Sequence, residues 1–140
     1  MDIMYTAVGH ATGDGRNGHV HTDDGSLDLD VRIPKEMGGP GGGTNPEQLF
    51  ALGYGACFHS AIKFVAQRDK LDTTDSEVSA TVGIGFSDAG TGFGLEVELD
   101  VVLPNLEHEE AVALVARAHE VCPYSNATRG NIEVTLNVID

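Results

Sequence analysis

The chain has 140 residues, 41% of them hydrophobic, so it is long enough to bury one core, and we expect a single domain over residues 1–140. Twenty-two acidic residues against eight basic residues give a formal net charge of −14. Because this charge repels phosphate backbones and anionic lipids, we expect no nucleic-acid partner and no membrane partner.

The first third of the chain predicts a small β-meander followed by a glycine-rich loop. Residues 27–33 alternate apolar and charged side chains, which is typical of a half-solvated strand, and residues 5–11 and 19–22 are shorter β-compatible segments. Residues 38–43 are glycines apart from one proline, so we expect a mobile loop there. Too little chain precedes this loop for it to be a domain boundary.

A long helix is predicted from Pro46 to about Lys70. Asn45 is a favourable N-cap, proline suits the first helical position, and Gln48 stands three residues after the cap. Apolar residues cover more than one stripe of this helix, so we expect a central helix that is buried on most sides. Two glycines in its interior, at positions 53 and 55, cost roughly 1 kcal/mol each. Either the packing is very close there, or the helix breaks and restarts.

The second half of the chain predicts a hairpin, a helix and a closing strand. Residues 78–86 and 93–101 alternate apolar and polar side chains and are joined by a link rich in Gly and Asp. Residues 105–122 have acids in the first turn and an apolar face, which indicates a helix, and residues 132–138 alternate as a strand. This order of elements, without regular βαβ alternation, predicts an α+β fold with mainly antiparallel sheets.

The two cysteines occupy different surroundings, because Cys57 lies within the long helix and Cys122 directly precedes Pro123. Two cysteines are too few for a disulfide scaffold, which leaves a redox pair, a metal pair or two inert buried thiols. The N-terminus lacks a basic segment followed by an apolar run, so we expect a cytoplasmic protein, where thiols are kept reduced. Cys122 is either the N-cap of a short helix beginning at Pro123 or the C-terminal end of the preceding helix.

A buried thiol has a raised pKa and is inert, so a reactive Cys57 needs a nearby cation. Arg16 is the candidate, because the glycines around it let the backbone aim its side chain inward, and Glu47 is a natural partner for a guanidinium in a cleft. The simpler interpretation of Arg16 is an arginine on an exposed turn. The simpler interpretation of Glu47 is an acid that is favourable in the first turn of a helix. In a straight helix, positions 47 and 57 lie about 15 Å apart along the axis and point about 80° apart. We therefore expect a helix break at Gly53–Gly55 or a second chain folded over the site.

Zinc binding is the alternative chemistry for the cysteines. His59 follows Cys57 by two residues and His119 precedes Cys122 by three, but on a helix the first spacing directs the two side chains about 200° apart. The second spacing is roughly compatible with one helix face, but a zinc site needs three or four converging ligands, so we expect no metal. The histidines on strand-like segments are interpreted as surface residues: His10, His19 and His21.

Three long motifs surround these candidate residues: Asn45-Pro46-Glu47-Gln48-Leu49-Phe50-Ala51, Tyr54-Gly55-Ala56-Cys57-Phe58, and Val121-Cys122-Pro123-Tyr124-Ser125-Asn126-Ala127-Thr128-Arg129-Gly130-Asn131. They resemble the organic hydroperoxide resistance proteins, a branch of the OsmC-type family. The resemblance extends over nearly the whole chain, from Tyr5 to the final strand. One departure is an extra residue before Arg16, compared with the Gly-Gly-Arg that is usual in the family.

The resemblance implies an OsmC-like fold in an intertwined homodimer, and a cysteine-based peroxidase that reduces organic and fatty-acid hydroperoxides to alcohols. Carried over by position, Cys57 is the peroxidatic cysteine, Cys122 is the resolving cysteine, and Arg16 with Glu47 activates Cys57. A disulfide between the cysteines is then reopened by a dithiol, implied to be dihydrolipoamide on a lipoylated protein, and no cofactor is required. We expect three aromatic residues to line an apolar mouth for the substrate: Phe50, Phe58 and Phe64.

The resemblance leaves three rival functions. The first is another OsmC-type peroxidase with a different substrate or reductant, against which the Cys122-Pro123-Tyr124 signature argues. The second is a non-catalytic thiol switch that senses peroxide, and the third is a lipid-binding module of the same fold. The fold alone can host each of them, so the site has to decide.

Overall fold

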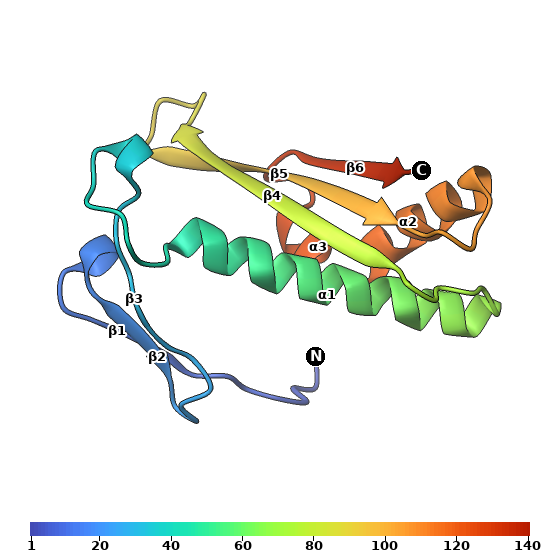
Figure 1. The fold of residues 1–140 in the computed structure, drawn as a ribbon, viewed down its shortest axis with the longest axis horizontal. Helices are drawn as coiled ribbons and strands as arrows, with labels where there is room; N and C mark the ends of the chain where they lie inside the picture. The colour runs from blue at the N-terminus through green and yellow to red at the C-terminus, as the bar shows by residue number, and fades with distance from the viewer. The chain divides into compact units, whose positions relative to one another are not determined.

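Figure 1 shows the fold in a computed structural model that describes residues 1–140. Contacts within the chain divide it into two compact units, residues 1–49 and residues 50–140, each with its own three-stranded sheet. The elements form an α+β protein with mainly antiparallel strand pairs, as predicted. The single domain expected from the chain length stays a prediction.

The first unit contains the predicted antiparallel meander. Strand β1 (Gly9–Thr12) pairs with β2 (His19–Thr22), which pairs with β3 (Asp28–Asp30). β3 is shorter than the predicted strand over residues 27–33, because the chain beyond β3 pairs with the segment before the long helix. There, the backbone N–H of Arg32 donates to the carbonyl of Thr44 at 2.8 Å.

The glycine-rich loop of the first unit is held by backbone hydrogen bonds. It follows a 3-10 turn, η2 (Lys35–Met37), and the N–H groups of Gly39 and Gly41 donate to the carbonyls of Pro34 and Ile33 at 3.1 and 3.0 Å. A Cβ atom at position 39 would lie 2.2 Å from the carbonyl oxygen of Ile33, so glycine is required at this close approach. These glycines therefore make a hydrogen-bonded turn.

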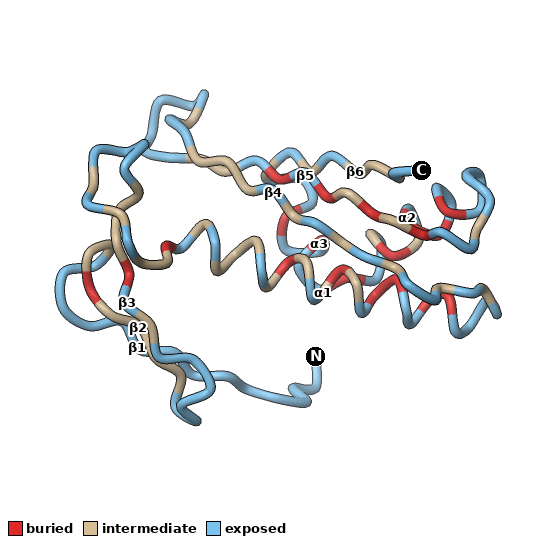
Figure 2. Tube along the Cα trace, viewed as in Figure 1, coloured by how far each residue is buried: buried red, intermediate tan, exposed pale blue.

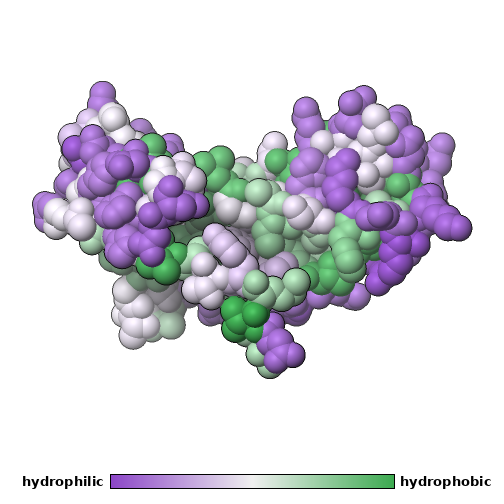
Figure 3. Space-filling model, turned by 90° about the horizontal axis from the view of Figure 1, so that it is seen from below, coloured by the Kyte–Doolittle hydropathy of each residue, from purple (hydrophilic) through white to green (hydrophobic).

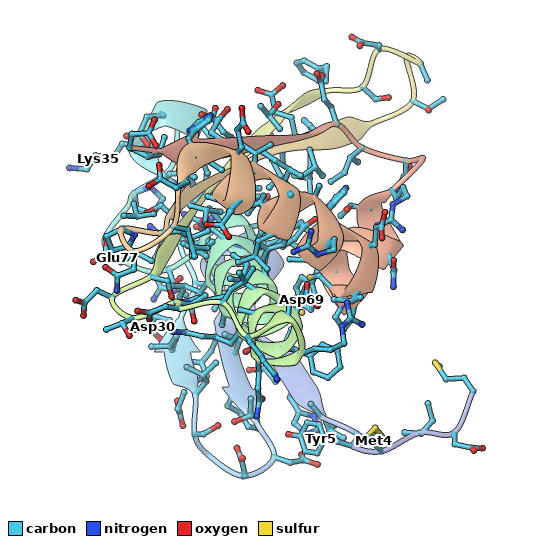
Figure 4. All side chains as sticks on the ribbon, turned by 90° about the vertical axis from the view of Figure 1, so that its right-hand side faces the viewer. Met4, Tyr5, Asp30, Lys35, Asp69 and Glu77 are labelled. Carbon is cyan, nitrogen blue, oxygen red and sulfur yellow. The ribbon has the colours of Figure 1, made fainter.

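Hydrophobic burial is sparse in the first unit, where Val31 is the one buried hydrophobic residue. The apolar side chains of the N-terminal tail are exposed, among them Met4 at 99% and Tyr5 at 79% (Figure 4). Since burial of apolar surface supplies most of the favourable free energy of folding, this unit cannot be stable on its own core alone.

The long helix α1 (Pro46–Asp69) begins as predicted and is continuous. The Asn45 side-chain oxygen accepts the N–H of Gln48 at 2.8 Å, which is the expected N-cap bond. Of the two alternatives that the sequence left open at Gly53–Gly55, the break is therefore excluded. Gly53 instead permits close packing, because a Cβ atom there would lie 3.0 Å from the Tyr124 hydroxyl.

Burial along α1 is confined to one face. This corrects the prediction that the helix is buried on most sides. The buried positions recur at helical spacing: Tyr54, Phe58, Ala61, Ile62, Val65 and Ala66. Two large apolar residues on other faces are exposed, Leu52 at 70% and Phe64 at 60%. By length and composition α1 could cross a membrane, but its buried face packs into the protein core, as in the core helix of a soluble protein.

The second unit places a three-stranded sheet and two further helices around this face of α1. Strands β4 (Glu77–Phe86) and β5 (Phe93–Val102) form the predicted hairpin, and β6 (Val134–Ile139) pairs parallel with β5. α2 (His108–Val121) begins three residues later than predicted and is followed by α3 (Pro123–Thr128). Figure 2 shows buried residues gathered on α1, β5 and α2, where the core lies.

Candidate active site

The two thiols predicted to act together face each other in the second unit. Cys57 lies on α1 and Cys122 lies at the junction of α2 and α3, with the two Sγ atoms 3.5 Å apart. Both cysteines are free, and Cys122 is fully buried whereas Cys57 is half-buried. A disulfide needs a sulfur separation of about 2.05 Å, so a shift of roughly 1.5 Å would join them. The pair is therefore poised for a disulfide without a rearrangement of the fold.

Cys122 satisfies both positions that the sequence allowed. Its N–H donates to the carbonyl of Ala118 at 2.9 Å and closes α2, while its carbonyl accepts the N–H of Asn126 at 2.9 Å and opens α3. Its φ of −64° and ψ of 125° are extended, as expected for a residue that precedes a proline. The cysteine is thus fixed on both sides by helices.

The surroundings of Cys57 disfavour its thiolate within the second unit. Burial is the largest influence and raises the pKa of the Cys57 thiol, and the neighbouring thiol of Cys122 raises it further. The backbone N–H of Tyr124 donates to the sulfur and acts in the opposite direction. The net effect is a raised pKa, so this cysteine needs a cation to become reactive at neutral pH.

An open hollow of about 410 Å³ is lined in part by Cys57. Its walls are mainly apolar and come from α1 and from the junction of α2 and α3: Ser60, Ala61, Phe64, Val121 and Pro123. Of the three aromatics expected at the mouth, Phe64 lines the hollow, whereas Phe58 is fully buried in the core and Phe50 packs edge-on against Tyr54. The hollow has the chemistry to hold an alkyl group beside the sulfur.

Arg16 and Glu47 form the predicted ion pair in the first unit. Arg16 stands on the 3-10 turn η1 (Gly15–Asn17), and its Nη1 and Nη2 atoms donate to the two Glu47 oxygens, both at 2.8 Å. This bidentate hydrogen bonding raises the pKa of Arg16 and lowers the pKa of Glu47. The extra residue before Arg16 does not prevent the pairing. The approach of Arg16 to Cys57 stays a prediction.

Sequence reasoning missed a buried set of polar side chains beside the thiol pair. The Tyr54 hydroxyl lies 2.8 Å from Ser125 Oγ and 3.1 Å from Thr128 Oγ1, and His119 Nδ1 lies 2.8 Å from the same Ser125 oxygen. The signal in the sequence was spacing, because Tyr54 precedes Cys57 by three residues and Ser125 follows Cys122 by three.

The histidines have other partners than a metal ion. His119 bonds Ser125, and His59 Nε2 lies 2.8 Å from Ser76 Oγ. Burial is the main cause that lowers the pKa of both. No group of three or more His, Cys, Asp or Glu side chains is arranged to hold a metal ion. On the first sheet, His19 bonds Asp28 and Asp30.

Comparison with known proteins defines the class of this fold and site. Residues 39–137 match the model of the family described as OsmC-like protein. The chain is 51% identical, over 97% of its length and 95% of the relative, to an organic hydroperoxide resistance protein of Xanthomonas axonopodis pv. citri.

Solved structures agree with the sequence match. A crystal structure of an organic hydroperoxide resistance protein from Legionella pneumophila has a TM-score of 0.94 at 51% identity and covers 99% of this chain and 100% of that one. The organic hydroperoxide resistance protein OhrB of Bacillus subtilis has a TM-score of 0.89 at 44% identity, with 98% and 100% covered. The chain belongs to the organic hydroperoxide resistance branch of the OsmC-like family.

Proposed function

We propose that this chain is a thiol peroxidase that confers resistance to organic hydroperoxides by reducing them, fatty-acid hydroperoxides included, to alcohols. The observation that carries the proposal is the pair of free thiols 3.5 Å apart beside an apolar hollow. The names of the related proteins support the same substrate class. The expected setting is the cytoplasm, where a dithiol reductant is available.

In the proposed reaction, the Cys57 thiolate attacks the distal peroxide oxygen. The O–O bond breaks, the released alkoxide takes a proton and leaves as the alcohol, and Cys57 becomes a sulfenic acid. The Cys122 sulfur then attacks the Cys57 sulfur, the S–O bond breaks and water leaves, so that a disulfide remains. A dithiol, proposed to be dihydrolipoamide on a lipoylated protein, restores both thiols through a mixed disulfide and becomes a disulfide itself.

Activation of Cys57 is assigned to Arg16, with Glu47 as its holder. Burial raises the pKa of the Cys57 thiol, and an adjacent guanidinium would favour the thiolate and offset this effect. Glu47 fixes the plane of that guanidinium through two hydrogen bonds. The same cation can stabilise the negative charge that develops on the leaving oxygen.

A homodimer is part of the proposal. Large apolar side chains are exposed on the tail and on α1, including Met4, Tyr5, Leu52 and Phe64, and hydrophobic residues are visible at the surface in Figure 3. Exposed apolar surface of this kind marks interaction sites. The separation of Glu47 and Cys57 along a straight helix required either a helix break or a second chain folded over the site. Because α1 is continuous, the second chain is the alternative that remains.

The test is dithiol-dependent reduction of tert-butyl and linoleic hydroperoxides by the purified chain, with hydrogen peroxide as the comparison. We expect faster turnover of the organic peroxides, complete loss in Cys57→Ser, and in Cys122→Ser a single oxidation of Cys57 without disulfide. Full turnover by Cys57→Ser would contradict the mechanism. Reduction of hydrogen peroxide alone would contradict the substrate class. One oxidation without repeated turnover would favour the thiol switch instead.

A further inference from the structure

Four polar side chains behind the thiol pair form a hydrogen-bonded group that the proposed reaction does not use. Tyr54 and Ser125 are fully buried, Thr128 is 5% exposed, and His119 is half-buried. The Tyr54 hydroxyl contacts both Ser125 and Thr128, and Ser125 also contacts His119. In a dry interior such bonds are strong, and a partner left without one is costly. The group therefore fixes the elements that it joins.

The elements joined by this group are the ones that carry the thiols. Tyr54 lies on α1 three residues before Cys57, and Ser125 lies on α3 three residues after Cys122. The 2.8 Å contact between the hydroxyls and the 3.5 Å contact between the sulfurs thus connect the same two segments, about one helical turn apart. Because both contacts join the same two helical segments, we expect a displacement at one of them to shift the other.

His119 braces the junction that holds Cys122. It stands three residues before Cys122, in the last turn of α2, and bonds Ser125 in α3 at 2.8 Å. This side-chain bridge passes across the cysteine from one helix to the next. Cys122 also makes backbone hydrogen bonds at the end of α2 and at the start of α3. The side-chain bond and these backbone bonds together fix the angle between the two helices.

We propose that Tyr54, Ser125 and His119 form a clamp that positions Cys122 for attack on the oxidised Cys57 and so sets the rate of disulfide formation. They are positioning residues, and their hydrogen bonds go to one another and to Thr128 rather than to a reacting sulfur. The step they control is the attack of the Cys122 thiolate on the Cys57 sulfenic sulfur, in which an S–S bond forms, the S–O bond breaks and hydroxide leaves and is protonated to water. In this form the inference rests on the proposed function.

A clamp of this kind does not affect the attack of Cys57 on peroxide. It affects whether the Cys57 sulfenic acid goes on to the disulfide or is oxidised further. A displacement of about 1 Å can slow a positioned reaction about 100-fold. A sulfenic acid that is resolved slowly meets a second peroxide and becomes a sulfinic acid, which a dithiol does not reduce. Loss of the clamp is therefore expected to leave peroxide attack unchanged and to increase irreversible oxidation of Cys57.

The experiment compares Tyr54→Phe and Ser125→Ala with Ile62→Val, a core variant on α1 whose apolar side chain makes no hydrogen bond to the clamp. Stopped-flow kinetics with tert-butyl hydroperoxide give the rate of Cys57 oxidation and the rate of disulfide formation, and mass spectrometry gives the sulfinic fraction. Oxidation by diamide gives disulfide formation without any peroxide. We expect disulfide formation to slow roughly 10- to 100-fold in both clamp variants with either oxidant. Ile62→Val should keep both rates, and Ser125→Thr, which keeps the hydroxyl, should restore most of the lost rate.

The outcomes separate the clamp from the proposed function. If Tyr54→Phe forms the disulfide as fast as Ile62→Val with diamide, the clamp is wrong. If peroxide attack and disulfide formation slow equally, the role is structural and the clamp is also wrong. If the wild-type chain forms the disulfide with diamide but not with hydroperoxide, the peroxidase proposal is wrong, and the diamide series alone decides the clamp. Should Ser125→Ala not fold, Tyr54→Phe carries the same test.

Discussion

The two units of the chain are stabilised by different means. The first has one buried hydrophobic residue, Val31, and relies on hydrogen bonds and ion pairs, whereas the second has fifteen residues in one hydrophobic cluster. The charged pair of the candidate site lies in the first unit and the thiol pair in the second. Burial in the second unit is also the largest cause that raises the pKa of the Cys57 thiol.

Core substitutions are expected to show the largest difference in unfolding free energy between the two units. Leu99→Ala, at a fully buried position of β5, should lower the free energy of unfolding by about 2–5 kcal/mol, because it removes buried methyl groups and leaves a cavity. Val31→Ala in the first unit should cost less, because fewer carbon atoms are lost and no larger core surrounds them. Urea unfolding followed by circular dichroism measures both. An equal loss for Val31→Ala would show that the first unit has a core of comparable strength.

Removal of the Arg16 charge is expected to have the next largest effect. In a Cys122→Ser background, where Cys57 is the one remaining thiol, Arg16→Met should move the midpoint of iodoacetamide alkylation to higher pH, because loss of a nearby cation raises the pKa of a thiol. Arg68→Met, which removes an exposed arginine elsewhere, is the control and should leave the midpoint in place. An unchanged midpoint in Arg16→Met would transfer the activating role to another cation.

The two interior glycines of α1 should respond differently to alanine. Gly55→Ala is expected to raise the free energy of unfolding by about 1 kcal/mol, because a new Cβ would meet Ala80 at an ordinary 3.9 Å while the helix gains propensity. Gly53→Ala should lose this gain, since its Cβ would press on Tyr124 at 3.0 Å. Thermal unfolding of both variants measures the difference. A full gain in Gly53→Ala would mean that Tyr124 moves aside freely.

The smallest effect is the titration of two histidines, one in each unit. Hydrogen bonds to Asp30 and Asp28 raise the pKa of His19, while burial lowers the pKa of His119. NMR titration should therefore give a midpoint above about 6.5 for His19 and a midpoint below about 6.5 for His119. By linkage, the His19 contacts stabilise the fold below pH 6.5 and are lost as pH rises through the higher folded-state value, whereas His119 destabilises the fold as it becomes protonated. Coinciding midpoints would contradict both assignments.

Local signals in the sequence were sufficient for several parts of the fold and the site. The N-cap at Asn45, the hairpin of β4 and β5 and the α+β order follow from residues that are neighbours in the chain. The pairing of Arg16 with Glu47 was predicted from the glycines around Arg16 and from charge complementarity. The joint action of Cys57 and Cys122 came from motif resemblance, because spacing does not encode it.

The features that the sequence left open or missed depend on partners far along the chain. A glycine in a helix fits a break or a close contact equally well, and the contact of Gly53 is 71 residues away, at position 124 (124 − 53). The exposed face of α1 carries Leu52 and Phe64, which have the composition of a core. The bond between Tyr54 and Ser125 could be found only once α1 and α3 were placed side by side.

A disulfide between the two neighbouring sulfurs would also lower the conformational entropy of the unfolded chain. A bond between Cys57 and Cys122 closes a loop of 65 residues (122 − 57), which removes conformational freedom from the denatured chain and stabilises the folded one by about 4 kcal/mol. A chain that carries this disulfide is therefore expected to unfold at a higher temperature than the chain with two free thiols. Each turn of the proposed cycle would raise the free energy of unfolding of the chain and then lower it again.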